Sequence, residues 1–376
     1  MDENADVVIA GGGPVGNALA LALQPCGLRV VLLEAHATPN PDRRPVAVSY
    51  GGRLILERLG VWPQLSVAAT PIRHIHVSQR GGFGRVALEA DEAGLPELGY
   101  VVDYMALTHE LSKAVGTAER RMNAQVTSWQ TGNPAQVHYK QGGTSYVLET
   151  PLLVVADGGG LVDADVVDYQ QSAVTARVVS AQSHGNRAYE RFTAQGPLAL
   201  LPDGDGWALV WTVSCDRANA LCAMPEQQFL AELRKEFGAR VGEFSSVSGR
   251  KSYPLLLRRA AQTPLQHTVL IGNAAQTLHP VAGQGFNLGL RDAWELAAHA
   301  LACREVPGSR SWMDQYLARR KTDRSLGVGF THTLVQLFSN DTPLLRTVRG
   351  AGLAALGGFP PFKNFLVKRM TFGARG

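Results

Sequence analysis

The amino-acid sequence predicts an α/β fold, in which a parallel sheet with flanking helices carries an inserted antiparallel β-sheet and is followed by C-terminal helices. Three observations predict it. A short buried strand, a glycine-rich turn and a helix occur together twice, near the N-terminus and again in residues 267–300. Between them, residues 172–253 have strand patterns separated by turns. After residue 331, apolar residues recur at roughly helical spacing.

Length and composition indicate a folded protein with a large core. The 376 residues are 45% hydrophobic, enough for two domains or one large composite. The net charge is +4, and no run of lysine or arginine resembles a nucleic-acid arm, so we expect no nucleic-acid partner. The four cysteines form no CxxC pair, which is typical of a reduced, cytoplasmic chain without disulfides or a zinc site.

The sequence predicts neither a secretory signal nor a membrane-spanning helix. Its start, MDENADVVIA, is acidic and enters a strand at once, unlike a signal peptide. No uninterrupted apolar stretch reaches the roughly 18 residues that a spanning helix needs. We therefore expect a cytoplasmic protein.

The first strand–turn–helix unit has the pattern of a nucleotide site. Residues 6–10 (DVVIA) are an apolar strand, and GGGPVG leads into a helical stretch at residues 17–23. Gly11 permits a tight turn, Gly13 lets a pyrophosphate approach the backbone, and Gly16 lets helix and strand pack closely. The N–H groups at the helix start would bind the phosphates.

A second strand supports this interpretation, because a glycine-rich turn alone is weak evidence. Residues 29–33 (RVVLL) end at Glu34, whose carboxylate can accept hydrogen bonds from an adenosine ribose and would repel a 2′-phosphate. The alternative is a structural βαβ unit with a chance acid. The combination predicts a Rossmann-like dinucleotide site, and Glu34 favours FAD or NAD over NADP.

The segment after Glu34 begins with a loop rich in Pro, Asn and Asp that ends at Arg44. The spacing alone favours a solvated surface arginine over a guanidinium near a cofactor. Residues 51–62 are then predicted to form a helix, ended by Gly60 and Pro63.

Polar residues at two predicted strands could bind a ligand or be structural. His74 and His76 lie two apart on one strand, but with no third ligand nearby we expect no metal site. Residues 152–156 (LLVVA) form a continuous apolar strand that ends at Asp157 and Gly158. An acid at this edge can bind a ligand hydroxyl, although an ordinary turn explains it equally well.

The middle of the chain predicts the antiparallel sheet, inserted into the nucleotide-binding region. Phe192, Trp207 and Trp211 would form its aromatic core. Its strands are expected at residues 173–179, 188–192, 198–201 and 207–213.

The second strand–turn–helix unit lies in HTVLIGNAAQTLHPVAGQGFNLG. Residues 267–271 are the strand, Asn273 lies just after it, and Gly283 and Gly285 belong to the second glycine turn. The helix is expected at residues 286–300. Its N-terminus carries about half a positive charge, which could stabilise an anionic flavin ring.

Together these elements resemble the FAD-dependent aromatic hydroxylases. The GxGxxG turn with its later Glu, the strand ending in Asp-Gly and the segment GNAAQTLHPVAGQGFNLGLRDA occur in that family's order. The third element is similar to the family's GD(A)…PxxGxGxNxG segment. With AYERFTAQGPLALLP upstream, it most resembles the branch that acts in ubiquinone biosynthesis. The resemblance covers nearly the whole chain.

The resemblance implies roles for individual residues. Arg44 would match the family arginine near the cofactor, which reverses the preference from spacing alone. Asp157 and Gly158 would touch FAD and help to dock NADH or NADPH, and Asn273 would reach the ribityl chain. The residues that would hold the ADP half of FAD are Gly11, Gly13, Gly16 and Glu34. Those that would flank the isoalloxazine ring are Pro280, Gly283, Gly285 and Asn287.

The sequence also departs from the family. Asn273 stands where the family has Asp, and Gln276 where it has His; an amide can still bond ribityl hydroxyls. After Asp157 and Gly158 the family usually has a Ser and an Arg, whereas here GGLVD follows. This difference leaves the choice between NADH and NADPH open.

The activity that the resemblance implies is hydroxylation of a prenylated phenol with O₂ and NADH or NADPH, through FAD. The protein must keep the site dry, position the ring and help to deprotonate the phenol. His279 is the candidate base, and a structural histidine is an equal alternative. Alternative functions are a prenyl-chain reductase and a non-catalytic flavin-binding scaffold of a biosynthetic complex; a plain NAD-dependent dehydrogenase leaves the second glycine turn unexplained.

We expect an FAD-binding domain from residues 1–72, 100–165 and 262–325, a substrate domain from 73–99 and 166–261, and a C-terminal helical segment from 326–376. Residues 362–369 combine Phe side chains with Lys and Arg, so a helix lying on anionic lipid is as well supported as simple packing. The expected partners are therefore the prenylated phenol, O₂, other ubiquinone-biosynthesis proteins and, peripherally, the inner membrane.

Overall fold

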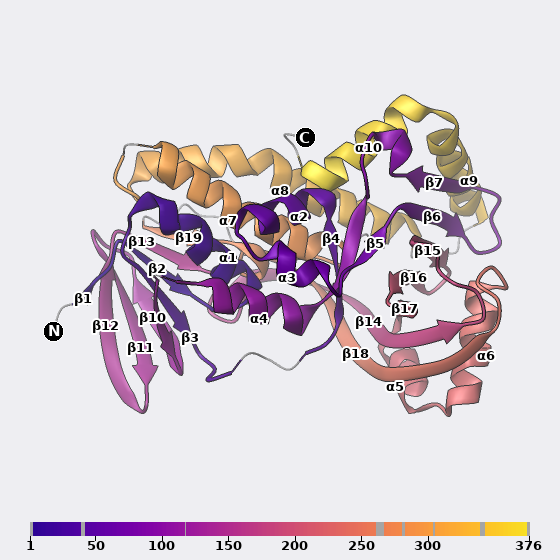
Figure 1. Cartoon of the computed structure of the whole chain (residues 1–376), viewed down its shortest axis with the longest axis horizontal. Helices are drawn as coiled ribbons and strands as arrows, with labels where there is room; N and C mark the ends of the chain where they lie inside the picture. The colour runs from indigo at the N-terminus through magenta and orange to yellow at the C-terminus, as the bar shows by residue number, and fades with distance from the viewer. Residues whose placement is uncertain are drawn as a thin grey trace.

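The computed structural model describes residues 3–38, 42–116, 118–260, 267–279, 283–303, 305–338 and 343–373. The molecule is elongated, with a parallel sheet toward one end and a large sheet at the other (Figure 1). The predicted α/β fold class is confirmed. Along the chain, strands of the large sheet fall between strands of the parallel sheet.

The parallel sheet has five strands in the order β19-β13-β2-β3-β9. All neighbouring strands in it run parallel. Its central strands are buried apolar runs, as expected for a sheet covered on both faces. The strands are β2 (Val7–Ala10), β3 (Val30–Glu34), β9 (Glu119–Met122), β13 (Leu152–Val155) and β19 (Thr268–Leu270).

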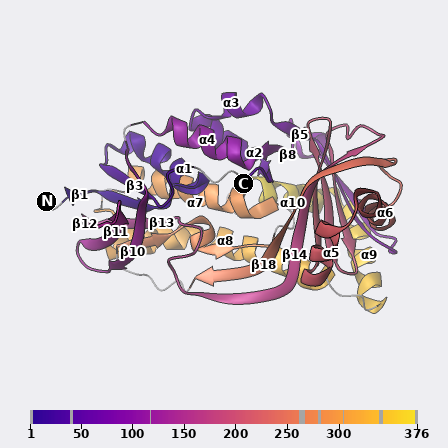
Figure 2. The same ribbon diagram turned by 90° about the horizontal axis from the view of Figure 1, so that it is seen from below.

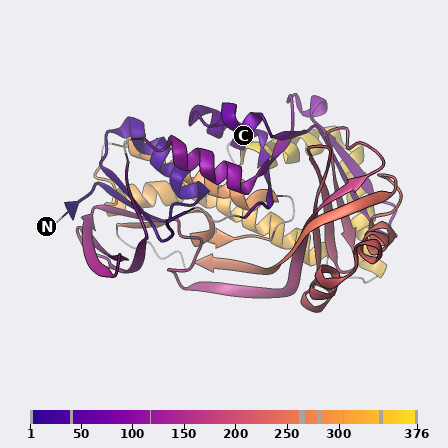
Figure 3. The ribbon, with the colours of Figure 1, turned by 60° about the horizontal axis from the view of Figure 1, so that its bottom comes forward.

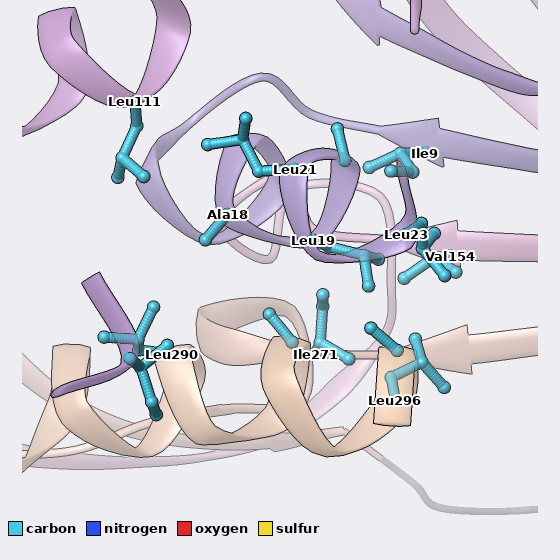
Figure 4. Close-up of a cluster of buried hydrophobic side chains, with 14 of the residues drawn as sticks. Ile9, Ala18, Leu19, Leu21, Leu23, Leu111, Val154, Ile271, Leu290 and Leu296 are labelled. Atoms are coloured by element: carbon cyan, nitrogen blue, oxygen red, sulfur yellow. The ribbon is translucent and has the colours of Figure 1, made fainter. Parts of the chain in front are cut away.

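Helices cover one face of this sheet. Ile9 and Val154 of the sheet pack against Leu19, Leu23 and other apolar side chains of the helices in one continuous core (Figure 4). The helices that share this core are α1 (Pro14–Leu23), α2 (Tyr50–Arg58), α3 (Trp62–Ser66), α4 (Tyr104–Ala114), α7 (Gln284–Ala302) and the start of α8 (Arg310–Phe338).

The other face packs on a four-stranded sheet of order β1-β12-β11-β10. Val8 and Val31 of the parallel sheet meet Val137, Tyr139 and Leu148 there. This layer comprises β1 (Glu3–Asn4), β10 (Ala124–Gln130), β11 (Ala135–Gln141) and β12 (Thr144–Thr150).

The large sheet has eight strands in the order β20-β18-β14-β17-β16-β15-β6-β7. It is antiparallel except where β15 pairs parallel with β6. The strands are β6 (His74–Gln79), β7 (Arg85–Glu89), β14 (Ala164–Ser180), β15 (Arg187–Thr193), β16 (Gly196–Asp203), β17 (Gly206–Ser214), β18 (Phe244–Ala260) and β20 (Gln276–Thr277). All four strands expected between residues 173 and 213 are confirmed.

Two long strands, β14 and β18, connect the two regions (Figures 2 and 3). The domain boundary expected after residue 165 falls inside β14, because this strand continues from one region into the other. A single long strand can belong to both regions, because one of its ends packs in the first region and the other end packs in the second.

Helices α5 (Cys215–Ala223) and α6 (Glu226–Phe237) cover one face of the large sheet. Trp207 and Trp211 are buried against them, as predicted for core aromatics, whereas Phe192 packs on the opposite face. That opposite face looks toward α9 (Pro343–Gly358) and α10 (Pro360–Phe372).

The remaining elements close the space between the regions. A small sheet contains β4 (Pro45–Ser49), β5 (Thr70–Ile72) and β8 (Gly99–Asp103) in the order β4-β8-β5. The single helix expected at residues 51–62 is wrong: the chain forms α2 (Tyr50–Arg58) and a separate α3 (Trp62–Ser66). Gly60, at a φ of +76°, separates them, and Pro63 lies in the first turn of α3, where its missing N–H costs nothing.

Candidate active site

A cavity of about 1000 Å³ runs between the parallel sheet and the large sheet. It begins at the turn after β2 and continues past β4 and the start of α7. It ends in an apolar compartment under α9 and α10. Both predicted glycine turns therefore open into one continuous space.

The N-terminal turn has the geometry that a bound pyrophosphate needs. Gly11 has a φ of +113°, and a Cβ there would lie 2.5 Å from the carbonyl oxygen of Ala156. A Cβ on Gly16 would overlap the Gly11 carbonyl oxygen, whereas one on Gly13 would meet no atom within 4 Å. No side chain caps α1, so the N–H groups of its first turn are available to an anion.

Glu34 lies at the end of β3, next to this turn. Its Oε2 accepts a hydrogen bond from the Gly12 N–H at 2.7 Å, and its Oε1 accepts one from the His36 N–H at 2.9 Å. The carboxylate is thus held at the cavity wall, where it can also accept hydrogen bonds from a ribose.

The second glycine turn lies at the start of α7. Gly283 has a φ of +59°, and a Cβ there would be 2.8 Å from the Cβ of Ala47. Gly285 lines the cavity, and a Cβ on it would meet no protein atom within 4 Å. As in α1, no side chain caps the helix. The turn therefore presents bare backbone to the cavity.

Asn287 holds this turn in place and is itself not part of the cavity lining. Its Oδ1 accepts from the Ser49 N–H at 2.8 Å, and its Nδ2 donates to Ala47 O at 2.9 Å and to Gly283 O at 2.8 Å. The amide thus ties β4 to the N-terminus of α7. The resemblance placed Asn287 beside the flavin ring, and the structure gives it a positioning role.

Arg44 lines the cavity at the entrance to β4. Its guanidinium lies 4.5 Å from the centre of the Tyr104 ring and 3.6 Å from the Asp42 carboxylate. The side chain is still partly solvated, with 39% of its surface exposed. The structure therefore brings Arg44 to the cavity, as the resemblance implied and the spacing alone did not.

Asp157, Gly158 and Asn273 also line the cavity, at the ends of β13 and β19. The Asp157 carboxylate accepts from the N–H groups of Gly159 at 3.0 Å and Leu161 at 2.8 Å, so it also stabilises its own turn. Asn273 is exposed. Pro280, the remaining residue expected at the ring, lies outside the described residues.

His279, the candidate base, lies away from this lining. Its side chain is only 1% exposed, and its ring packs edge-on against Tyr169 at 5.6 Å. Burial lowers the pKa of His279 to about 4, so the imidazole is neutral at pH 7 and a weak base. The geometry favours the structural alternative for this residue.

The far compartment is formed by one face of the large sheet and by the C-terminal helices. Strands β6, β7 and β15 to β17 supply apolar side chains, and Leu353, Leu356, Leu366 and Met370 face them from α9 and α10. An apolar compartment of this kind can hold a long hydrocarbon chain.

Two acidic residues at the site were not identified from the sequence. Glu190, on β15, lines the cavity within the apolar compartment. Asp292, on α7, is fully buried and accepts hydrogen bonds from Arg320 at 2.9 Å, Arg324 at 3.1 Å and the Gly272 N–H at 3.2 Å. Asp292 thus fixes the turn after β19 to α7 and α8. Both residues lie inside segments used for the resemblance, but the residues that surround them in the structure are distant in sequence.

The expected absence of a metal site is not contradicted by the described residues, where no cluster of three or more His, Cys, Asp or Glu could hold an ion. His74 instead pairs with Glu89, and the ring of His76 lies 5.7 Å from that of Tyr189.

Comparisons with known proteins agree with this geometry. A family model described as an FAD binding domain matches residues 4–325. Ubiquinone hydroxylase UbiL of Rhodospirillum rubrum is 33% identical over 98% of this chain and 89% of its own length. The 3-demethoxyubiquinol 3-hydroxylase of Escherichia coli is 31% identical over 94% of this chain and 95% of its own length.

Solved structures show the same fold at lower identity. The p-nitrophenol 4-monooxygenase PnpA of Pseudomonas putida DLL-E4 superposes with a TM-score of 0.78 and 20% identity, covering 100% of both chains. The Diels-Alderase PyrE3 of pyrroindomycin biosynthesis has a TM-score of 0.72 and 23% identity, over 99% of this chain and 80% of its own. Because their reactions differ, the fold alone does not select the chemistry.

Proposed function

This chain belongs to the family of FAD-binding domains, and from that premise we propose that it is an FAD-dependent monooxygenase. It uses NADH or NADPH and O₂ to hydroxylate the aromatic ring of a prenylated phenol in ubiquinone biosynthesis. The observation that carries the proposal is the single cavity that joins both glycine turns to an apolar compartment. The two ubiquinone-pathway hydroxylases, aligned over nearly the whole chain, support the choice of substrate class.

The residues of the cavity fit FAD. The open N-terminus of α1, the bare Gly13 and the Glu34 carboxylate would hold the ADP half. Arg44, Asp157 and Asn273 lie along the path from there to α7. The isoalloxazine ring would lie next to four residues that line the cavity: Ala47, Gly283, Gly285 and Phe286.

FAD, when bound and reduced by NADH or NADPH, supplies the activation of O₂. The chain does the rest. The start of α7 directs its positive end at the ring site, which favours a negatively charged ring. The apolar sheet face and the C-terminal helices exclude water from the place where the phenol lies. We propose residues 1–72, 100–165 and 262–325 for the cofactor and 73–99 and 166–261 for the substrate, as expected from the sequence, with β14 running across the boundary.

The apolar compartment accounts for a prenyl chain. A phenol ring placed between the start of α7 and the large sheet would direct its chain under α9 and α10. Val86 and Leu88 of β7 and Leu353 of α9 belong to one apolar cluster there. Each buried CH₂ contributes about 0.8 kcal/mol, so a chain of several isoprene units gains affinity in proportion to its length.

The test is a spectrum followed by product analysis. We expect about one FAD per chain in the visible spectrum, and faster NADH or NADPH oxidation when a prenylated phenol is added. With ¹⁸O₂, the product should gain one labelled oxygen on the ring. Flavin binding without labelled product would support the scaffold, and saturation of the prenyl chain would support the reductase. A protein that stays colourless in excess FAD would contradict the proposal.

We also propose a peripheral membrane contact through α10. No helix in the described part of the chain is long and apolar enough to cross a membrane. Phe362 and Phe365 are 54% and 52% exposed and stack on each other, and Lys368 is exposed beside them. Lys363 contributes less than the sequence suggested, because it is buried and paired with Glu92.

This geometry determines how the contact should be tested. Removing α10 would also remove Leu366 and Met370 from the cavity wall, so a truncation cannot separate membrane binding from folding. We therefore propose Phe362→Ser with Phe365→Ser, and Val67→Ser as a control at another exposed apolar residue. In co-sedimentation with anionic vesicles, the double variant should bind more weakly while its FAD content stays the same. Equal binding of all forms would contradict the contact.

A further inference from the structure

Glu190 lies in the middle of β15, on the face of the large sheet that borders the cavity. Side chains alternate along a strand, so Glu190 shares this face with Ala188 and Phe192. Its neighbours face the other way: Tyr189 packs on Trp207 and Phe237, and Arg191 donates to Glu236 O at 3.1 Å.

The nearest neighbours of Glu190 in the sheet are apolar, and Thr175 and Thr212 are polar residues of the cavity lining on the same face. Val77 on β6 and Ala199 on β16 lie directly across from it in the sheet. Further out on the same face are the cavity-lining residues Ile75, Leu201 and Val210. Burial alone raises the pKa of Glu190 to about 7. A carboxyl in this position does not stabilise the sheet.

Charged groups of the neighbouring elements are directed elsewhere. On β6 and β7, His74 pairs with Glu89, and His76 lies against Tyr189 on the far face. On α10, Lys363 pairs with Glu92, and Arg369 lies 5.1 Å from the Phe365 ring. Arg349 of α9 is also buried, but the pKa of Glu190 is shifted by burial and not by this charge. The other charged residues of the cavity lining are Glu34, His36, Arg44, Arg120 and Asp157, all outside the large sheet.

We propose that Glu190 is a catalytic residue that takes the proton of the substrate's phenol hydroxyl. The inference rests on the proposed function. The phenol O–H bond breaks and a Glu190 O–H bond forms, while the electron pair stays on the phenolate oxygen. That charge raises the electron density of the ring at the carbon to be hydroxylated. The proton returns to the phenolate oxygen of the product, so Glu190 is ionised again for the next turnover.

The geometry assigns this step to Glu190 in preference to His279. Glu190 borders the cavity, whereas His279 is buried outside its lining. A general base is most effective when its pKa lies near the working pH, because it is then ionised often enough and still binds the proton well. Glu190 meets that condition and His279, with a pKa of about 4, does not.

The test compares Glu190→Gln with Glu89→Gln, a carboxyl-to-amide change on the opposite face of the neighbouring strands. With an ordinary prenylated phenol, we expect Glu190→Gln to lower kcat at least tenfold with KM changed less than threefold. The wild-type rate should rise with pH around 7, and that rise should disappear in the variant. Glu89→Gln should match the wild type.

A nitro-substituted prenylated phenol, which ionises without help, gives the second arm. Its hydroxylation should be nearly the same in Glu190→Gln and wild type. Its phenolate also absorbs visible light, so the spectrum of the bound compound, taken without turnover, should show that it is equally ionised on the wild type and on the variant. A wild-type rate of Glu190→Gln on the ordinary phenol, or equal slowing on both phenols, would overturn the proposal. A wild type that hydroxylates neither phenol would instead refute the proposed function.

Discussion

Replacing Gly285 with valine tests whether the second glycine turn adjoins the flavin ring. Gly285 is in the first turn of α7, lines the cavity, and would carry a Cβ with no protein atom within 4 Å. The protein alone therefore has room for the side chain. The residue stands in a helix, where valine is more favourable than glycine by a few tenths of a kcal/mol.

The substitution should leave the stability of the apoprotein nearly unchanged and weaken the binding of FAD. Without cofactor, the free energy of unfolding should change by no more than about 0.5 kcal/mol. With cofactor, the branched side chain would occupy space that the ring needs. Forced overlap in a packed site costs about 1–3 kcal/mol, which is a loss of FAD affinity between about 5-fold and about 150-fold. Activity should be lost in the same variant.

The assay is FAD titration of the apoprotein followed by fluorescence, with urea unfolding of the same apoprotein. Gly329→Val is the matched control, because Gly329 is an exposed helical glycine of α8 with an equally open Cβ position. Gly283→Val should differ from both by also destabilising the apoprotein, since its φ is +59° and Ala47 is too close. If Gly285→Val binds FAD and turns over like the wild type, the ring lies elsewhere and the reasoning is refuted.

Three further changes are expected to act at separate places. Glu34→Ala should weaken FAD binding by about 1–3 kcal/mol, the range for a hydrogen bond to a charged group, and unchanged affinity would place the ribose elsewhere. Leu356→Trp should narrow the compartment under α9, so that kcat/KM falls more for a long-chain phenol than for a short-chain one; an equal fall for both would contradict a chain-binding role. Asp323 is buried, which by itself raises its pKa, but Arg291 at 3.0 Å and Arg320 at 2.8 Å hold the pKa below the usual value. Its stabilisation is therefore present above about pH 4 and is lost as the pH falls through the lowered pKa. Asp323→Asn should cost about 3–5 kcal/mol at pH 7 by urea unfolding and less at pH 3, and a constant difference would be inconsistent with the ion pair.

The features predicted from the sequence are those whose cause is local. Gly11, Gly13 and Glu34 could be recognised because each has a local requirement. These are a tight turn, the close approach of a pyrophosphate to the backbone and an acid at the end of a strand. The strands of the large sheet were predictable because alternation and turns are also local signals. The division of residues 50–66 into two helices was missed because Pro63 can either end a helix or begin one.

The features that were missed depend on contacts between distant segments. Glu190 lies inside AYERFTAQGPLALLP, which supports the resemblance, but this segment does not show that the acid borders a cavity, because that follows from the pairing of β15 with β6 and β16. The side chain of Arg44 had to be located by resemblance, because its neighbour Tyr104 comes much later in the chain. In the same way, His279 could be favoured as a base only while its burial was unknown.

The meeting of the two glycine turns follows from the strand order. β2 and β19 are parallel to β13 from either side, so their carboxyl ends open at one edge of the sheet. The helices that follow must then pass close to each other. A Cβ on Gly289 would lie 2.9 Å from Val15 and 3.1 Å from Gly272, so glycine at this crossing lets α7 approach α1. The two uncapped helix starts are thereby held beside one cavity, and a cofactor with a pyrophosphate in its nucleotide half and an ionisable ring at its other end can use both.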